Sequence, residues 1–200
     1  MTKKKHKKLV ASLLLLIVII IALVLYLNRG LFTQIKHNLE QRQALIKVQK
    51  EITFELNKYN QEYILLGQGT TNSYCYILYP LTESTLLKDL LRAGANTQKN
   101  LCGKVFYVPI QQEAELQSSM LNYIFSQPAY QRKELLEMWF KRANLPLANL
   151  PQNLQQLYQI QQDFNLSQYT FPIYIKYQPE SHSVRWYIGE RAERELLQFK

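Results

Sequence analysis

The sequence predicts an α/β domain with a mixed β-sheet and an inserted block of helices, preceded by one transmembrane helix and a helical stalk. Three observations lead to this architecture. Leu9 to Leu27 contains no charged residue, a strand–helix–strand pattern occupies residues 74–110, and two closely spaced strands followed by a helix close the chain. A composition of 47% apolar and 20% charged residues in a chain of 200 is sufficient for one domain with its own core.

The apolar segment from Leu9 to Leu27 is about as long as the ~20 residues that a helix needs to cross a bilayer. A cleaved signal peptide has a shorter apolar region, of about 7 to 15 residues, and a small-residue cleavage site, which the closing sequence LYLNRG lacks. Residues 1–8 form a basic tail and only Arg29 follows closely, so the positive-inside rule places the N-terminus in the cytoplasm. We therefore expect a single-pass protein of a bacterial inner membrane with a periplasmic C-terminal domain.

The charge of the chain is concentrated at its N-terminus. The lysines at positions 3, 4, 5, 7 and 8 supply more than half of the net charge of +9. Lipid headgroups of the inner membrane are a sufficient partner for them. The rest of the chain has a mild positive surplus without a basic stripe, which argues against nucleic-acid binding.

Residues 28–60 are polar and rich in Gln, Lys and Glu, which predicts a helical stalk. Its apolar residues form an approximate stripe, but Asn38, Arg42 and Gln49 interrupt that stripe at heptad positions. Two interpretations stay open. We favour a solvated spacer over a weak homodimer formed through the stalk.

The folded domain is expected over residues 61–200. Ser73 to Pro80 is rich in aromatic residues, which is typical of a strand, and Thr82 is a suitable N-cap for the helix that follows. Lys104 to Ile110 is the next strand, so this segment predicts a βαβ unit with parallel strands. Inserted helices follow at about 113–164, and the last two strands have only a short turn between them, which predicts an antiparallel hairpin.

From residue 74 onward, the layout resembles the thioredoxin-like catalytic domain of the periplasmic disulfide isomerases of the DsbC/DsbG type. The segments that carry the resemblance are KVFYVPI, SQPAYQRKELLEMWF, TFPIYI and VRWYIGERAERELLQF. The resemblance implies a cis peptide bond between Phe171 and Pro172.

The resemblance also places the family's Cys-x-x-Cys motif on Glu83, Ser84, Thr85 and Leu86, where neither sulfur is present. Disulfide exchange needs a thiolate that attacks sulfur. We therefore expect that the redox motif has been lost, and we favour a domain that is not an enzyme.

Cys75 and Cys102 are the two cysteines of the chain. Their positions in the βαβ unit put both at the far edge of the sheet, within reach of a disulfide. We favour a structural disulfide. Two separate thiols and a displaced redox pair remain alternatives, and the redox pair is disfavoured because the neighbouring sequence offers no electropositive setting for a reactive thiol.

Other ligand sites find little support in the sequence. His6, His37 and His182 are too far apart in the expected layout to bind one metal ion, and no nucleotide-binding pattern occurs, so no metal and no cofactor are expected. A groove at Thr82, Phe171 and Pro172, where the related family receives its substrate, is a candidate site for an extended polypeptide.

These features predict a scaffold or chaperone-like binding subunit of an envelope assembly, for which the resemblance makes a conjugation or type IV secretion apparatus the natural candidate. Its partners would be other envelope proteins or an extended polypeptide. Two alternatives are an anchored thiol-disulfide oxidoreductase that uses Cys75 and Cys102, and a coiled-coil structural protein of the envelope.

Overall fold

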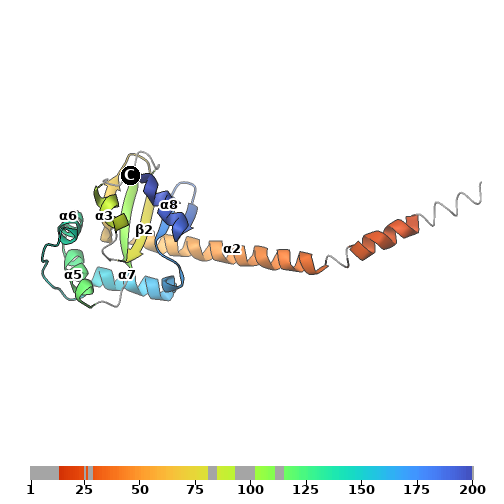
Figure 1. Cartoon of the computed structure of the whole chain (residues 1–200), viewed down its shortest axis with the longest axis horizontal. Coiled ribbons are helices and arrows are strands. Elements are labelled where there is room, and N and C mark those ends of the chain that lie inside the picture. The colour runs from red at the N-terminus through yellow and green to blue at the C-terminus, as the bar shows by residue number, and fades with distance from the viewer. Residues whose placement is uncertain are drawn as a thin grey trace, which may run out of the picture. The chain divides into compact units, whose positions relative to one another are not determined.

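The computed structural model describes residues 14–24, 26, 29–80, 85–92, 102–110 and 115–199 (Figure 1). Contacts divide the chain into two compact units, residues 1–48 and residues 49–200. The first unit contains an apolar helix at residues 14–24 and most of α2, which runs from Arg29 to Lys58. The second unit contains the last turns of α2 and the β-sheet.

The expected transmembrane helix over residues 9–27 is wrong. No helix in the described part of the chain combines the length and the apolar composition that a membrane crossing needs. Residues 1–13, 25, 27 and 28 lie outside the described residues. The expected single-pass inner-membrane localisation depends on that helix and is corrected with it.

The second unit is built around a five-stranded mixed sheet with the strand order β1-β3-β2-β4-β5. β2 (Tyr74–Pro80) and β3 (Lys104–Ile110) are parallel, as the βαβ pattern predicts. β4 (Ile173–Gln178) pairs antiparallel with both β2 and β5 (Ser183–Ile188), which confirms the closing hairpin. β1 (Ile64–Gln68) pairs antiparallel with β3 and forms the other edge.

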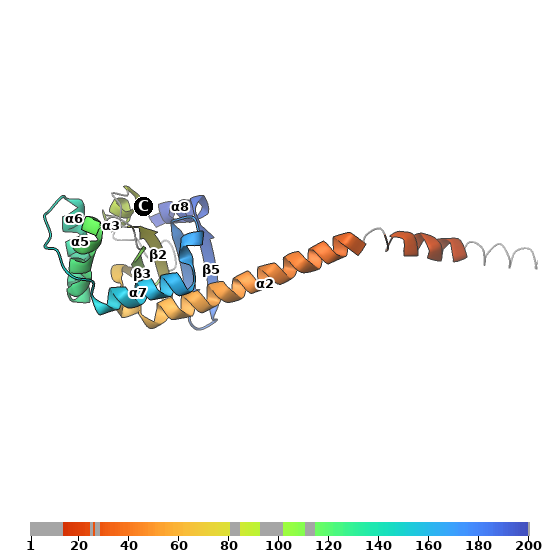
Figure 2. The ribbon, with the colours of Figure 1, turned by 90° about the horizontal axis from the view of Figure 1, so that it is seen from below.

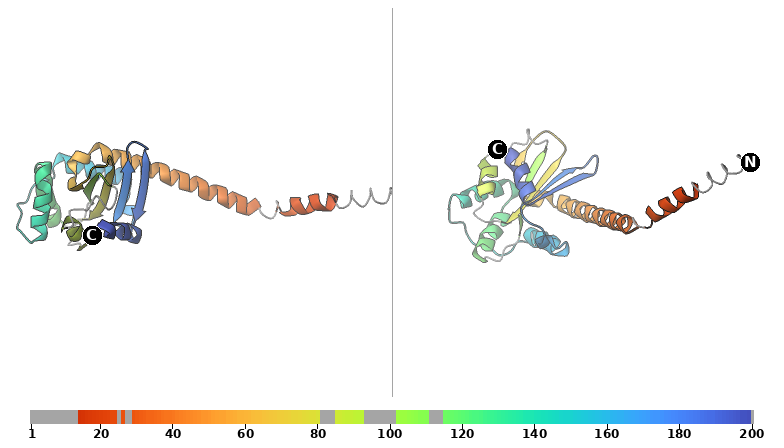
Figure 3. Two further views of the ribbon diagram at one scale, coloured as in Figure 1. Left: turned by 90° about the horizontal axis from the view of Figure 1, so that it is seen from above. Right: turned by 45° about the vertical axis from the view of Figure 1, so that its right-hand side comes forward.

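Helices cover both faces of this sheet. α3 (Thr85–Arg92) and α8 (Glu190–Leu196) lie on one side, and α7 (Gln152–Asp163) lies on the other side with the end of α2 (Figure 2 and Figure 3). α5 (Glu115–Ser126) and α6 (Ala129–Phe140) form, with α7, the inserted helical block that the sequence predicts. The described chain also contains short 3-10 helices: η1 (Asn60–Glu62), η2 (Leu166–Gln168) and η3 (Leu197–Phe199).

A parallel βαβ unit joined to an antiparallel hairpin, with helices on both faces of a mixed sheet, defines a thioredoxin-like fold. β3 shows how the sequence identifies a strand that lies inside the sheet. Six of its seven residues are buried, because a strand with neighbours on both sides and helices on both faces is apolar almost throughout.

The last turns of α2 belong to the core of the second unit. Ile52 and Leu56 have no exposed surface and are part of the same apolar cluster as the sheet. Two neutral hydrogen bonds connect the helix to the strands: Trp186 Nε1 to Thr53 Oγ1 at 3.0 Å, and Tyr76 OH to Asn57 Oδ1 at 2.8 Å. α2 is therefore exposed over residues 33–48 and covers the sheet with its last turns.

Arg132 connects the helical block to the segment that precedes the sheet. Its side chain is almost buried, and its guanidinium donates to the carbonyl oxygens of Glu62 at 2.7 Å and Gln127 at 2.9 Å. The Glu62 carboxylate lies 3.6 Å from Nη2, and the Phe125 ring centre lies 5.2 Å from the guanidinium carbon. A charge buried to this degree is stable only with such partners, so Arg132 holds α6 against η1.

Candidate functional site

The resemblance to the disulfide isomerases places the lost redox motif between the end of β2 and the first residues of α3. Thr82, Glu83 and Ser84 lie outside the described residues, whereas Thr85 and Leu86 are the first two residues of α3. None of these residues carries sulfur, so this corner has no group that could attack a disulfide. The assignment of residues 83–86 to a lost motif stays a prediction.

The peptide bond between Phe171 and Pro172 is cis. Pro172 directly precedes β4, whose first residue Ile173 pairs with Leu78, so the cis bond lies beside the C-terminal end of β2. The Gly189 N–H donates to the Pro172 carbonyl oxygen at 2.9 Å, which ties this bend to the end of β5. The expected groove at Thr82, Phe171 and Pro172 is thus described only on its Phe171 and Pro172 side.

Cys75 and Cys102 form a disulfide, with 6.0 Å between their Cα atoms and a sequence separation of 27. Cys75 pairs with Val105 of β3 and with Lys176 of β4, whereas Leu78 pairs at the other end of β4. The disulfide therefore lies at the opposite end of the sheet from the cis-proline bend, as the sequence predicts.

The disulfide is enclosed by protein. Only 1% of Cys75 and 2% of Cys102 is exposed. The Tyr174 hydroxyl lies 3.3 Å from Cys75 Sγ and 3.4 Å from Cys102 Sγ. Burial, and after it the nearby Glu195 carboxylate, raises the pKa of Tyr174 well above its usual value. A neutral hydroxyl therefore covers both sulfur atoms over the whole physiological pH range.

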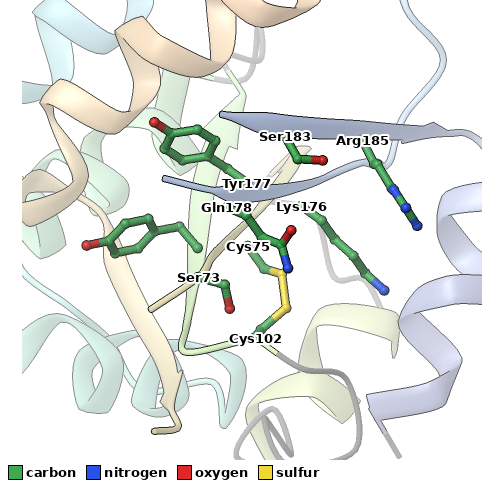
Figure 4. A pocket seen from close by; sticks show the side chains of 9 residues that line it. Ser73, Cys75, Cys102, Lys176, Tyr177, Gln178, Ser183 and Arg185 are labelled. Atoms are coloured by element: carbon green, nitrogen blue, oxygen red, sulfur yellow. A yellow bond between two sulfur atoms is a disulfide. The ribbon is translucent and has the colours of Figure 1, made fainter. Parts of the chain in front are cut away.

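A surface pocket of about 280 Å³ lies beside the disulfide (Figure 4). Its polar lining comes from the residue before β2 and from the β4–β5 hairpin: Ser73, Lys176, Gln178, Ser183 and Arg185. The two cysteines also border the pocket, but their small exposed fractions mean that a molecule in the pocket would meet mainly the polar side chains.

The register of the hairpin brings two cations together. Lys176 of β4 pairs directly with Arg185 of β5, and two like charges in opposed positions are destabilising unless something compensates them. Lys176 has such compensation, because its Nζ lies 3.5 Å from Glu195 Oε2 and above the rings of Tyr174 and Tyr187, 5.4 Å and 5.6 Å from their centres. In the described part of the chain, Arg185 makes no ion pair or hydrogen bond.

This pocket is not predicted from the sequence. Its signal was present, because Lys176 and Arg185 interrupt the two apolar strands TFPIYIKY and SVRWYIG, but only the exact pairing of the strands puts them side by side. The expectation that no electropositive group lies near the cysteines is also wrong, since Lys176 lines the same pocket as the disulfide.

A scan against protein-family models found no match, and a search of curated proteins found none either. Among solved structures, a crystal structure of BcfH from Salmonella enterica Typhimurium is similar to this chain, with 8% identity and a TM-score of 0.49 over 98% of this chain and 97% of that chain. By its own strand order, residues 49–200 form a thioredoxin-like domain with an internal disulfide between Cys75 and Cys102. Its membership of the DsbC/DsbG type stays a prediction.

Proposed function

We propose that residues 49–200 form a redox-inert, thioredoxin-like binding domain that acts as a scaffold or chaperone-like subunit of a larger protein assembly. The position of the sulfur atoms is the observation that best supports this function. Thiol–disulfide exchange needs an accessible sulfur atom and a reactive thiolate. The two cysteines are bonded, almost unexposed and at the opposite end of the sheet from the corner that the related enzymes use.

The disulfide has a sufficient role in stability. It connects the start of β2 to the segment before β3 and so closes the βαβ unit. A cross-link around a loop of this length stabilises a folded chain by about 3–4 kcal/mol through the entropy of the unfolded state. Stability alone therefore explains the presence of the disulfide, without a catalytic role.

The expected partner is another protein or an extended polypeptide. Both ends of the strand order, β1 and β5, are edge strands in the described sheet, and edge strands can accept an added strand from a partner. The conjugation or type IV secretion apparatus stays a prediction, as does a homodimer formed through α2.

A thiol-disulfide oxidoreductase is the second candidate, and one observation favours it. Lys176 and the Tyr174 hydroxyl lie close to the disulfide, and a cation and a hydrogen-bond donor both stabilise a thiolate. The burial of both sulfur atoms argues against this function, because an attacking thiolate cannot reach them.

The reduction of insulin by dithiothreitol separates the two candidates, because the released B chain aggregates and scatters light. An oxidoreductase shortens the delay before scattering, whereas a chaperone-like protein lengthens it. We expect the full 200-residue chain to lengthen the delay, and the doubly substituted Cys75→Ser, Cys102→Ser chain to do the same while circular dichroism shows it folded. Shortening of the delay by the parent chain but not by the double variant would overturn the proposed function.

A further inference from the structure

We infer that the β4–β5 hairpin is a docking site for an extended acidic polypeptide segment, which pairs with the outer edge of β5 and places an Asp or Glu carboxylate beside Arg185. This inference rests on the proposed binding function and specifies the chemistry of the partner. It depends on three features of the hairpin: its hydrogen-bond donors, its charge and its position at the edge of the sheet.

The hairpin offers a small platform of hydrogen-bond donors. Lys176 pairs with Arg185 and Gln178 pairs with Ser183, and all four side chains line the pocket (Figure 4). The carbonyl oxygen of the Gln178 side chain already accepts from Ser181 at 3.4 Å, which leaves the amide N–H groups for a ligand. Lysine and arginine are donors only. The group that fits this platform is therefore a hydrogen-bond acceptor.

The charge of the platform selects an anion with a single negative charge. Lys176 is paired with Glu195, so one positive charge, that of Arg185, is left uncompensated in the described residues around the pocket. A carboxylate carries one negative charge, whereas a phosphate group carries about −1.5 to −2 at neutral pH. Arginine also presents its N–H groups in a planar fork that matches the two oxygens of a carboxylate.

The position of Arg185 indicates a polypeptide rather than a small molecule. Arg185 and Ser183 lie on β5, the outermost strand on its side of the described sheet (Figure 2). Side chains that face each other on paired strands lie on the same face of a sheet. A strand added along β5 would therefore direct the residue opposite Arg185 onto the pocket face, where a carboxylate would relieve the repulsion between Lys176 and Arg185.

Two blocked octapeptides test this inference. Both have an extended, β-branched sequence, an acetylated N-terminus and an amidated C-terminus; one carries Glu at alternate positions and the other carries Gln. Fluorescence anisotropy with the full-length chain should show that the Glu peptide binds about tenfold more tightly or better, because its hydrogen bonds to Arg185 are charge-assisted. The preference should weaken as salt is added.

A pair of variants assigns the binding to this pocket. Arg185 is exposed, so Arg185→Gln should fold normally and lose most of the preference for the Glu peptide. Arg191→Gln is the matched control, because Arg191 lies on α8 against the Tyr187 ring at 5.3 Å and does not line the pocket. It removes the same charge from the same face and should change affinity by less than about twofold, since only long-range attraction is reduced.

Hydrogen exchange tests the strand pairing. The Glu peptide should slow the exchange of backbone amides in residues 183–188, because an added strand accepts hydrogen bonds from the edge of β5.

Equal binding of the Glu and Gln peptides, equal effects of Arg185→Gln and Arg191→Gln, or unchanged exchange in residues 183–188 would each overturn the inference. None of these outcomes contradicts the proposed function. That function has its own test and is overturned if the chain accelerates insulin reduction. If the chain delays insulin aggregation but binds the Glu and Gln peptides with equal affinity, it is a binding domain with a different docking site.

Discussion

The two faces of the sheet are built from alternating residues of the same strands, yet they differ in kind. On the face that α2 covers, Tyr74, Tyr76 and Tyr177 contact Phe106 or each other with ring centres 5.7–6.3 Å apart. On the other face, β2 and β4 present the disulfide, the Tyr174 hydroxyl and the Lys176–Glu195 ion pair. The first face is closed by apolar burial, which makes it a source of stability. The second keeps a charged pocket open to solvent, which suits recognition.

Removing apolar area from the first face should have the largest effect on stability. Leu56 is fully buried between α2 and the sheet, and Leu56→Ala should lower the free energy of unfolding by about 2–5 kcal/mol, because it removes buried methyl groups and leaves a cavity. Urea denaturation followed by tryptophan fluorescence measures this change.

Leu45→Ala is the control on the same helix. Leu45 is 46% exposed, so its substitution should cost less than about 0.5 kcal/mol, as is usual for exposed positions. Equal costs at positions 45 and 56 would contradict the assignment of the end of α2 to the core.

Opening the disulfide tests the second face. The doubly substituted Cys75→Ser, Cys102→Ser chain should be less stable by about 3–4 kcal/mol, because the loop that the bond closes becomes free in the unfolded state. Urea denaturation of the parent chain with and without reductant gives an independent value, and the reductant should have no effect on the variant. An unchanged midpoint in the parent chain under reduction would show that the bond contributes nothing to stability.

Both faces contain tyrosines that resist ionisation. Burial raises the pKa of Tyr76 on the first face and of Tyr174 on the second well above the usual value. In the unfolded chain these hydroxyls ionise near pH ~10, so their contribution to stability is complete below about pH 10 and decreases as the pH rises above it. Urea midpoints from about pH 8 to 11 should therefore be constant at first and then fall.

Phenylalanine variants assign that alkaline loss to the two faces. Tyr76→Phe and Tyr174→Phe should each reduce the fall in the urea midpoint above pH ~10, since the substituted ring cannot ionise. Tyr177→Phe is the control for the loss of a hydroxyl from a buried ring on the covered face. A fall that is identical in the parent chain and in Tyr174→Phe would contradict the burial of that hydroxyl beside the disulfide.

A single hydrogen bond between α2 and the sheet should have a smaller effect. Thr53→Val keeps the shape of the side chain but removes the acceptor of the Trp186 N–H, together with the bond that the Thr53 hydroxyl donates to the Gln49 carbonyl oxygen within α2. It should lower the free energy of unfolding by about 1 kcal/mol. Thr53→Ser keeps the hydroxyl and is the comparison for the bond itself. If Thr53→Ser costs more than Thr53→Val, then methyl packing and not the hydrogen bond connects the helix to β5.

The sequence predicts the pattern of the strands better than the partners of each side chain. Alternation and turn residues are local, so β2, β3 and the β4–β5 hairpin could be predicted, and the spacing of Cys75 and Cys102 around the βαβ unit indicated their disulfide. The role of Ile52 and Leu56 could not be predicted in the same way, because a polar helix with a few apolar residues gives no signal of what covers them. The pocket at Lys176 and Arg185 depends on the register between β4 and β5. A slip of one residue in that pairing would put the two side chains on opposite faces of the sheet.

The ion pair on the second face should contribute least to stability and most to selectivity. Lys176 and Glu195 are both partly exposed, so Glu195→Gln should change the free energy of unfolding by less than about 1 kcal/mol. The same change leaves Lys176 uncompensated beside Arg185 and makes the pocket more positive, so the affinity for the Glu octapeptide should rise by about two- to threefold at low salt. Glu193→Gln, an exposed position on the same helix, should leave this affinity nearly unchanged. If both variants raise the affinity equally, the charge of α8 as a whole attracts the peptide, and Glu195 has no special role in neutralising Lys176.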